Sequence, residues 1–378
     1  MARYKFEQIA INSTEKKKPV EEDRFTYVGL EHLDPGSLKV TRFGSETAPV
    51  GEKLVMHKGD VLFGKRRAYQ KKVAIAPFDG IFSAHGMVLR PKEDIVDKNF
   101  FPLFISSDYF LDEAIRISVG SLSPTINWRD LKELEFELPD LEEQRKLAEV
   151  LWAINDAMEA YKKLISATEE LVKSRFIEMF GDPEAETCTY CTCKLRELSN
   201  KISDGVHAKP KYLDSGRPFL SVVNINKKKI DFTDCKYVSE EAYQKMIKST
   251  YPEKGDVLYT KVGTYGIPAY VDTDEEFCLY VSVCLIKPKH DLINSKFLAL
   301  QMDMPFIRNQ ADSRIKGIGV PDLHLNQIAE FDIINPPRYL QDDFVAFAEQ
   351  TDKSKYELEQ ALLELTATYK RIVAENLG

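Results

Sequence analysis

The chain has 378 residues, of which 43% are hydrophobic, 30% charged and 11% aromatic. This composition is typical of folded globular domains and argues against a disordered chain, and the length favours two or three domains. The sequence contains no run of eighteen apolar residues and no apolar leader at its start, so we expect a cytoplasmic protein that does not enter a membrane.

The net charge of −8 is unevenly distributed along the chain. Residues 1–140 and 181–340 each carry 21 basic and 22 acidic side chains, whereas residues 141–180 carry 6 and 8 and residues 341–378 carry 4 and 8. The overall sign does not exclude a nucleic-acid partner, because a local basic surface can exist on an acidic chain. Residues 53–72 form such a segment, with seven basic residues and one acid.

Residues 1–140 predict a β-rich globular domain with a few helices. Short runs rich in Val, Ile, Phe and Tyr are interrupted by Gly, Pro and Asp. One such run, Val61-Leu-Phe63, leads into the basic loop 65–72. The segment from Gly59 to Lys65, which contains this run, matches the GxxxxGK phosphate-binding pattern. Arg66, however, stands where Ser or Thr would bind magnesium. We interpret that match as chance.

Residues 141–180 predict one long helix. Apolar residues recur at alternating steps of four and three, which is the spacing of a coiled coil. The seam consists of Leu147, Leu151, Ile154, Met158, Tyr161, Ile165, Thr168 and Val172. Pro139 precedes the helix, and Gly181-Asp-Pro183 is expected to end it.

Residues 181–340 repeat the pattern of residues 1–140. Three motifs of the first block return at an offset of 196 or 197 residues: Lys58-Gly-Asp-Val-Leu-Phe-Gly-Lys65 as Lys254-Gly-Asp-Val-Leu-Tyr-Thr-Lys261, Gly120-Ser-Leu-Ser-Pro-Thr-Ile-Asn127 as Gly317-Ile-Gly-Val-Pro-Asp-Leu-His324, and Leu131-Lys-Glu-Leu-Glu-Phe-Glu-Leu-Pro139 as Ile328-Ala-Glu-Phe-Asp-Ile-Ile-Asn-Pro336. Three matches at nearly one offset indicate an internal duplication.

A second long helix is expected over about residues 341–376, with Gly378 after its end. Its seam consists of Phe344, Phe347, Thr351, Leu358, Ala361, Leu365 and Ile372. We predict an α+β fold in which two β-rich domains are joined by two long antiparallel coiled-coil helices, with a pseudo-two-fold internal repeat. The alternative is that each helix packs only on the block that precedes it.

The sequence offers no constellation for catalysis or for metal binding. Asn335-Pro-Pro-Arg338 resembles the Asn-Pro-Pro-Tyr or Asn-Pro-Pro-Phe motif of DNA methyltransferases, but Arg338 replaces the ring that must stack on the target base. Cys188-Thr-Tyr-Cys191 is half of a zinc site without a second pair at the usual spacing, so reduced thiols are the preferred interpretation. We therefore predict a non-catalytic chain.

The loops that follow the two Gly-Asp-Val-Leu strands are polar, and they occupy equivalent positions with different sequences. Such loops are typical of readers of two different DNA half-sites, since Arg and Lys contact phosphates and guanine while Gln and Thr reach other base edges. The candidate DNA-binding residues are Lys65, Arg66, Arg67, Tyr69, Gln70 and Lys71 in the first loop and Lys261, Thr264 and Tyr265 in the second. We expect phosphate contacts from Lys71 and Lys261, and base contacts from Arg67, Gln70 and Thr264. The alternative is a solvated basic hairpin.

With these features in place, the whole chain resembles the specificity subunit of type I restriction–modification systems. The resemblance rests on the order of motifs along the chain, in which the variable globular block is followed by the Gly120 to Asn127 motif, by Leu134-Glu-Phe-Glu-Leu-Pro-Asp-Leu-Glu-Glu-Gln-Arg145, by the long helix and by Met179-Phe-Gly-Asp-Pro183. The second copy departs from the pattern, because Pro337-Arg-Tyr-Leu-Gln-Asp-Asp343 keeps only the glutamine, Gln341.

The resemblance implies target-recognition domains at 1–140 and 181–340, helical spacers at 141–180 and 341–378, and a bipartite site in double-stranded DNA. It implies no cofactor in this chain. Two modification subunits would carry the adenine methyltransferase and S-adenosylmethionine, and restriction subunits would carry the ATP- and magnesium-dependent translocase and nuclease. The alternatives are a coiled-coil scaffold with protein- or carbohydrate-binding heads and a catalytic methyltransferase fusion.

Overall fold

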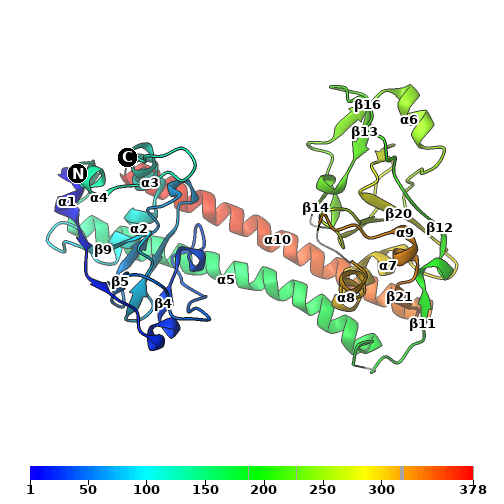
Figure 1. Cartoon of the computed structure of the whole chain (residues 1–378), viewed down its shortest axis with the longest axis horizontal. Coiled ribbons are helices and arrows are strands. Elements are labelled where there is room, and N and C mark those ends of the chain that lie inside the picture. Colours follow the sequence, from blue (N-terminus) through cyan, green and yellow to red (C-terminus); the bar gives the residue numbers. More distant parts are fainter. Residues whose placement is uncertain (186, 227, 316–318, 378) are drawn as a thin grey trace. The chain divides into compact units, whose positions relative to one another are not determined.

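The computed structural model describes residues 1–185, 187–226, 228–315 and 319–377. Gly317 and Ile318 of the expected repeat and Gly378 at the expected end of the second helix lie outside the described residues. The chain divides into two compact units, and Figure 1 shows their elements. The first unit comprises residues 1–163 and 359–378, and the second comprises residues 164–358.

The first unit is built on two four-stranded sheets, ordered β2-β9-β6-β7 and β3-β5-β8-β4, in which only β4 and β8 run parallel. A separate pair, β1 and β10, joins the two ends of the domain. The strands are β1 (Ala2–Lys5), β2 (Ala10–Ser13), β3 (Lys16–Lys17), β4 (Tyr27–Val28), β5 (Lys53–Met56), β6 (Val61–Phe63), β7 (Val73–Ile75), β8 (Gly80–Phe82), β9 (Met87–Pro91) and β10 (Glu135–Leu138). The short helices are α1 (Phe6–Ile9), α2 (Phe100–Ser106), α3 (Asp108–Arg116) and α4 (Trp128–Leu131).

The second unit repeats this plan. Its four-stranded antiparallel sheet has the order β12-β20-β17-β18, a β11-β21 pair joins the ends of its domain, and β13 pairs parallel with β19 and antiparallel with β16. The strands are β11 (Thr192–Lys194), β12 (Ser199–Asp204), β13 (Arg217–Leu220), β14 (Ile225–Asn226), β15 (Lys229–Ile230), β16 (Lys236–Val238), β17 (Val257–Thr260), β18 (Pro268–Tyr270), β19 (Cys278–Leu279), β20 (Val283–Pro288) and β21 (Asp332–Ile334). The short helices are α6 (Glu240–Met246), α7 (Ser295–Gln301), α8 (Pro305–Arg314) and α9 (Leu325–Ala329).

The register of the central strands confirms the duplication predicted from the sequence. Leu62 lies opposite Val88 and Ala74, and Leu258 lies opposite Leu285 and Ala269, so β6 and β17 have equivalent neighbours. Successive side chains of a strand point to opposite faces of its sheet. Val61 and Phe63 therefore enter one apolar core and Leu62 another, which explains why the run is apolar throughout.

The two long helices are α5 (Leu141–Phe180) and α10 (Arg338–Leu377), with 40 residues each. Every residue of the two predicted seams is buried or half-buried, whereas Leu164, Leu171 and Leu363 outside the seams are exposed. The spacing of apolar residues therefore identified the inward face of each helix correctly.

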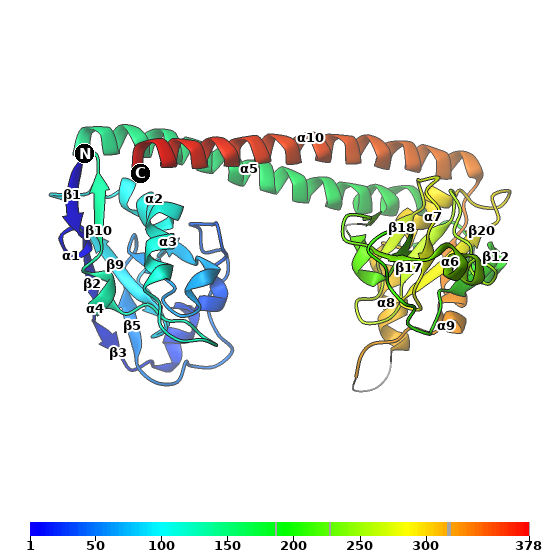
Figure 2. The ribbon, with the colours of Figure 1, turned by 90° about the horizontal axis from the view of Figure 1, so that it is seen from above.

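Each unit contains one half of each long helix. In the first unit, Leu151 near the start of α5 shares a core with Val373 near the end of α10. In the second unit, Phe176 and Phe180 at the end of α5 share a core with Phe344 near the start of α10. Figure 2 shows α5 and α10 side by side within each unit. The start of one helix thus meets the end of the other, which confirms the antiparallel pairing and excludes helices that pack only on the preceding block.

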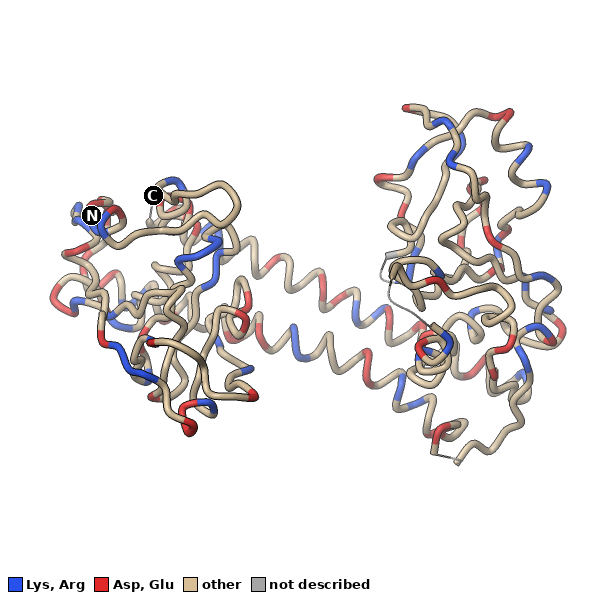
Figure 3. The backbone as a smooth tube through the Cα atoms, in the orientation of Figure 1, with Lys and Arg blue, Asp and Glu red and all other residues tan. Residues whose placement is uncertain are grey.

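Acidic and basic residues are interspersed along the two long helices (Figure 3). Several form pairs one helical turn apart, among them Lys162 with Glu159, Lys173 with Glu170 and Arg175 with Glu178. Such pairs favour helix formation by a few tenths of a kcal/mol, about 0.2–0.5 each. None of the helices in the described ranges has the length and apolar character needed to cross a membrane.

Candidate nucleic-acid interface

The two predicted reading loops leave their sheets in the same way. In the first unit, the carbonyl oxygen of Lys65 accepts a hydrogen bond from the Ile126 amide at 2.9 Å, and in the second the carbonyl of Lys261 accepts one from Leu323 at 2.9 Å. Two residues further along, Arg67 and Gly263 donate to Pro124 and Pro321, at 2.8 and 2.9 Å. Both residues have a positive φ, 55° and 75°. The backbone frame is thus duplicated while the side chains that it carries differ.

The first loop exposes Arg66, Arg67 and Tyr69 to solvent, with Gln70 half-buried beside them. Arg66 donates to the Ser123 hydroxyl at 3.0 Å. Within the described part of the chain, the guanidinium of Arg67 has no hydrogen-bond or ion-pair partner. An exposed guanidinium free of carboxylates is suited to contact a phosphate or a guanine edge.

Lys71 is less free than Arg67. Its ammonium group lies 2.7 Å from Asp108 and 2.6 Å from Asp112. Partial burial opposes the charge on Lys71, but the hydrogen bonds to both carboxylates hold its pKa above the ordinary value. The predicted phosphate contact at Lys71 would require these ion pairs to open, because an ammonium shared by two carboxylates has little attraction left for a third anion.

Lys65 occupies a different environment from the other residues of its loop. It is half-buried, and burial together with the neighbouring charge of Lys16 lowers its pKa. The two lysines line a cavity of about 170 Å³, together with Asn12, Ser13, Thr14, Leu54, Gly86, Met87, Ile126, Asn127 and Trp128. Lys65 therefore belongs to a concave basic site and not to the exposed tip of the loop.

In the second loop, the lysine that follows the central strand lies in the interior of the domain. Lys261 is only 4% exposed, and its ammonium lies 3.5 Å from Asp204 and 3.3 Å from Asp322. Its predicted phosphate contact conflicts with this burial, because the charge is already compensated inside the domain. Thr264 is exposed, as a base-reading residue must be.

Tyr265 is half-buried and held from two sides. Its hydroxyl donates to Asp312 at 2.8 Å, and the guanidinium of Arg308 lies over its ring at 4.2 Å from the centroid. Arg308 also donates to the carbonyl oxygen of Tyr265 and to Asp312. Arg308 was not predicted from the sequence, because α8 is distant from the loop along the chain and no motif marks it.

His85 and Lys16 are further residues of the first basic surface that the sequence analysis missed. His85 lies 3.5 Å from Arg66, and burial together with the charges of Arg66, Lys65 and Lys53 lowers its pKa. Lys16 is exposed and lies 3.7 Å from Glu52. Both come from strands and turns that only the sheet pairing brings beside the loop, so no local pattern could have identified them.

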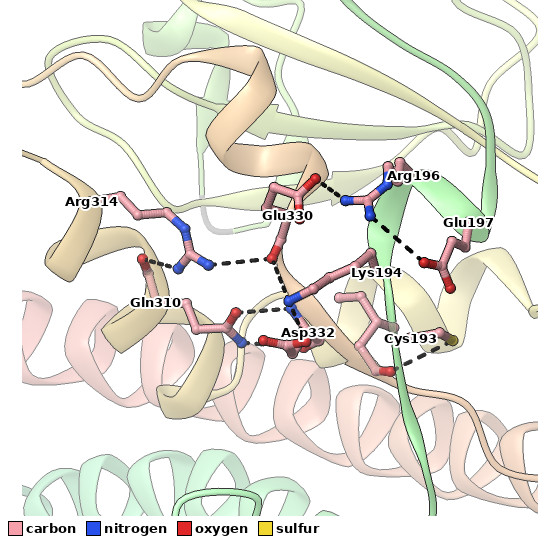
Figure 4. A network of polar contacts seen from close by, with 9 residues as sticks. Cys193, Lys194, Arg196, Glu197, Gln310, Arg314, Glu330 and Asp332 are labelled. Atoms are coloured by element: carbon pink, nitrogen blue, oxygen red, sulfur yellow. Dashed lines mark hydrogen bonds and ion pairs between the residues drawn. The ribbon is translucent and has the colours of Figure 1, made fainter.

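Another group of charged residues, around β11 and β21 of the second unit, forms ion pairs within the domain. Figure 4 shows Lys194 paired with Asp332 at 2.7 Å, and Arg196 paired with both Glu197 and Glu330. The side-chain oxygen of Gln310 accepts a hydrogen bond from the Asp332 amide at 2.8 Å, and its side-chain nitrogen donates one to the Asp332 carbonyl at 3.2 Å. The ion pairs tie β11 and the turn after it to β21, where the domain begins and ends, and Gln310 ties α8 to β21.

The motifs resembling catalytic sites have structural roles. The middle of the GxxxxGK match is strand β6, so its amides bond to neighbouring strands and cannot cradle a phosphate. Pro336 and Pro337 directly precede α10, and Arg338 is its first residue. Among the described residues, no three His, Cys, Asp or Glu side chains are grouped as metal ligands.

The sequence matches the family model of the type I restriction modification DNA specificity domain twice, over residues 24–169 and 192–366. The EcoDI specificity subunit of the type I restriction enzyme from Escherichia coli is 27% identical over 160 residues, covering 41% of this chain and 35% of that subunit. The MjaIX specificity subunit from Methanocaldococcus jannaschii is 25% identical over 275 residues, covering 67% of this chain and 62% of that one. These alignments thus span less than two thirds of either relative.

Solved structures share the fold over nearly the whole chain. A chain from a type I R-M system superposes with a TM-score of 0.59 at 18% identity, covering 99% of this chain and 97% of that one. The S subunit of the type I restriction-modification system from M. genitalium gives 0.54 at 15% identity, covering 100% and 96%. Since the family model matches most of the chain, in two copies that coincide with the duplicated fold, the protein belongs to the family of the type I restriction modification DNA specificity domain.

Proposed function

We propose that this chain is the sequence-specificity subunit of a type I restriction–modification complex and that each unit reads one half of a bipartite DNA site. The observation that carries the proposal is a duplicated backbone frame with different exposed side chains at equivalent positions. Arg67 and Gly263 share a hydrogen-bonding pattern and a positive φ, yet one carries a free guanidinium and the other has no side chain. Two copies of one scaffold with divergent tips can read two different sequences.

The electrostatics of the first unit support contact with a polyanion. Arg66, Arg67, Lys16 and Lys65 lie on or beside one loop, and His85 adjoins them. Such a cluster supplies the phosphate contacts that position a reader on the duplex, while the exposed loop tip reaches base edges. The second loop offers Thr264 for a base contact, with Tyr265 and Arg308 fixed behind it.

The long helices are proposed to dock partner subunits in the cytoplasm. Their exposed faces combine paired charges with isolated apolar side chains such as Leu164, Leu171 and Leu363. This mixture suits a protein partner better than DNA, since the net negative charge of the helices would repel phosphate. Two modification subunits would bind S-adenosylmethionine and methylate adenine, and restriction subunits would use ATP and magnesium. This chain would select the sequence and catalyse no step.

Methylome mapping tests the proposal directly. The full chain is expressed with its modification subunit in a host that lacks other methylases, and methylated adenines are mapped by long-read sequencing. We expect a bipartite motif, and exchanging the side chains of residues 66–70 should alter one half of it only. The two-reader proposal would be overturned if the chain supported no sequence-dependent methylation, or if the loop exchange altered both halves of the motif together. The first of these results would favour the alternative of a coiled-coil scaffold with protein- or carbohydrate-binding domains.

A second measurement addresses catalysis. The purified chain, free of modification subunit, is incubated with labelled S-adenosylmethionine and DNA. We expect no methyl transfer until the modification subunit is added. Transfer by the lone chain would contradict a non-catalytic role.

A further inference from the structure

Lys65 and Lys261 occupy the same place in the two units but differ in their counter-ions. Both follow the central strand of the four-stranded sheet, and the carbonyl oxygen of each accepts the hydrogen bond of an equivalent residue, Ile126 or Leu323. Lys261 is enclosed by Asp204 and Asp322. Among the described residues, no carboxylate pairs with the ammonium of Lys65.

The sheet register shows which residues of the first unit replace the two aspartates. Ser203 and Asp204 lie opposite Leu285 and Cys284, and Ser13 lies opposite Val88, the counterpart of Leu285. Thr14, the residue after Ser13, therefore stands where Asp204 stands. Thr125 bridges to Arg66 as Asp322 bridges to Val262, so Thr125 stands where Asp322 stands. Two neutral threonines have replaced both counter-ions.

The replacement leaves the ammonium-bearing side chain of Lys65 without a carboxylate partner among the described residues, in the lining of a cavity. The cavity of about 170 Å³ is lined on its polar side by the two lysines and by hydroxyl and amide groups from Asn12, Ser13, Thr14 and Asn127. Hydroxyl, amide and ammonium groups can all donate hydrogen bonds, which is what a phosphate oxygen accepts. No acidic residue belongs to the lining.

The energetics of an unpaired, half-buried lysine also favour an anion. Burial and the charge of Lys16 lower the pKa of Lys65, so its charged form is less favourable in this place than in water. A bound anion would offset both penalties at once, because it compensates the charge of Lys65, counters the repulsion by Lys16 and replaces the water lost on burial. Lys261 gains nothing from such a ligand, since its two aspartates already neutralise it.

We propose that the cavity between Lys16 and Lys65 binds one backbone phosphate of DNA, so that the first unit has an anchoring site that the second unit lacks. The inference rests on the proposed DNA-reading function. It adds an asymmetry: the first unit holds the duplex backbone through a concave site beside its reading loop, while Lys261 stabilises the second unit from within. The chemistry recognised is a phosphate group, which a free phosphate ion also presents.

The first arm of the test measures phosphate binding by the full chain without DNA. Lysine side chains are labelled by reductive ¹³C-methylation, and inorganic phosphate is titrated while NMR signals are followed, with the Lys65 signal assigned through Lys65→Arg. We expect the Lys65 signal to shift and its pKa to rise, with the signal of exposed Lys98 unmoved. The double variant Thr14→Asp with Thr125→Asp should weaken phosphate binding about tenfold or more, because an internal carboxylate then takes the hydrogen bonds of Lys65. The neutral control, Thr14→Asn with Thr125→Asn, should keep it.

The second arm measures duplex binding as a function of salt, again with the full chain. Each phosphate contact contributes about −0.9 to the slope of log affinity against log salt. Lys65→Gln should reduce the magnitude of that slope by about this amount on any sequence, whereas Lys98→Gln, at an exposed lysine outside the lining, should not. If the double aspartate variant fails to fold, Lys65→Gln also replaces it in the phosphate titration.

The outcomes separate the site from the proposed function. A Lys65 signal that ignores phosphate, or a salt slope that Lys65→Gln leaves unchanged, overturns the anchoring site. If phosphate shifts the Lys65 signal but duplex DNA added afterwards does not displace the phosphate, the anchoring site is also overturned. The cavity is then assigned to free phosphate. A failure of the two-reader proposal appears elsewhere, in methylome mapping, and leaves the phosphate titration interpretable.

Discussion

Gln144 and Gln341 make the same contacts at the start of the two long helices. The side-chain oxygen of Gln144 accepts from the Asp97 amide at 2.8 Å, and that of Gln341 accepts from Asn294 at 2.8 Å. Each side-chain nitrogen donates to the proline that precedes its helix, Pro139 or Pro336, also at 2.8 Å. Gln341 is the residue that the second copy keeps where its neighbours diverge, and its burial explains why.

Gln144→Ala and Gln341→Ala should therefore each destabilise the unit in which they lie. Removing either amide takes the side-chain partner from a backbone N–H and a backbone carbonyl that are partly or fully buried, which costs about 1–3 kcal/mol. Urea unfolding of the full chain, followed by far-UV circular dichroism, measures the change. Gln350→Ala is the matched control at an exposed glutamine, and it should change stability by less than about 0.5 kcal/mol. Equal effects of all three substitutions would contradict the anchoring role.

Phe176→Ala should weaken the pairing of α5 with α10 in the second unit. The ring is 1% exposed and lies within 5.4 Å of the Phe344 ring and 5.9 Å of the Phe306 ring, centroid to centroid. Truncation of such a buried aromatic costs about 3–5 kcal/mol. Leu171 lies on the exposed face of α5, outside the apolar seam, so Leu171→Ala should lower the stability far less. Thermal unfolding compares the two, and a larger loss for Leu171→Ala would mean that the helix seam has been wrongly identified.

Lys261→Gln and Lys71→Gln distinguish a buried charge from a surface charge. Each lysine pairs with two aspartates, but the side chain of Lys261 is 4% exposed and that of Lys71 is 35% exposed. Loss of Lys261 should destabilise the second unit by about 3–5 kcal/mol, because Asp204 loses its buried partner. Loss of Lys71 should cost no more than about 1 kcal/mol. Urea unfolding decides, and a Lys261 variant of native stability with weakened DNA binding would restore the expected phosphate contact.

Arg67→Ala and Thr264→Ala should each relax one half-site. A base contact of this kind is worth about 1–3 kcal/mol of discrimination. Competition binding with duplexes substituted in one half-site, in the presence of modification subunits, should show the loss in one half for Arg67→Ala and in the other half for Thr264→Ala. Both residues are exposed, so the unfolding midpoint should stay unchanged. An unchanged binding preference would mean that the loops are solvated hairpins.

The cysteines should differ sharply in reactivity towards iodoacetamide. Burial raises the pKa of the Cys278 thiol to about 12 and holds that of Cys284 well above its usual range. The thiolate is the reactive form, so at pH 8 these two thiols should react only after unfolding, whereas exposed Cys191 should react in the folded chain. Peptide mass spectrometry identifies the labelled residues. Labelling of Cys278 at the rate of Cys191 would contradict the packing of β19.

Much of the architecture followed from local sequence patterns. The apolar periodicity from Leu147 to Val172 identified the inward face of α5, because a helix places residues three and four apart on one side whatever surrounds it, and Pro139 and Gly181-Asp-Pro183 indicated its bounds. The second helix begins at Arg338, three residues earlier than expected, because Pro337 is well suited to precede a first turn. The division into four segments was drawn along the chain, whereas each compact unit contains half of both long helices.

The candidate site was only partly accessible to the same reasoning. The basic loop after β6 was identified from its composition, and Arg66, Arg67 and Tyr69 are indeed exposed. His85 and Arg308 were missed because their proximity to the loops depends on strand pairing and on α8, which no short motif records.

The sequence by itself determined the duplication, the two helices and the position of both loops, because each depends on neighbouring residues or on the identity of repeated motifs. Only the tertiary structure decided the charge environment of Lys65 and of Lys261, which the repeat aligns as equals. Asp204 and Asp322 come from segments distant along the chain to pair with Lys261, whereas threonines stand at the matching positions beside Lys65 and supply no counter-ion. The state of a charge depends on every group that folding brings within a few ångströms, and that set cannot be read from its neighbours in the chain.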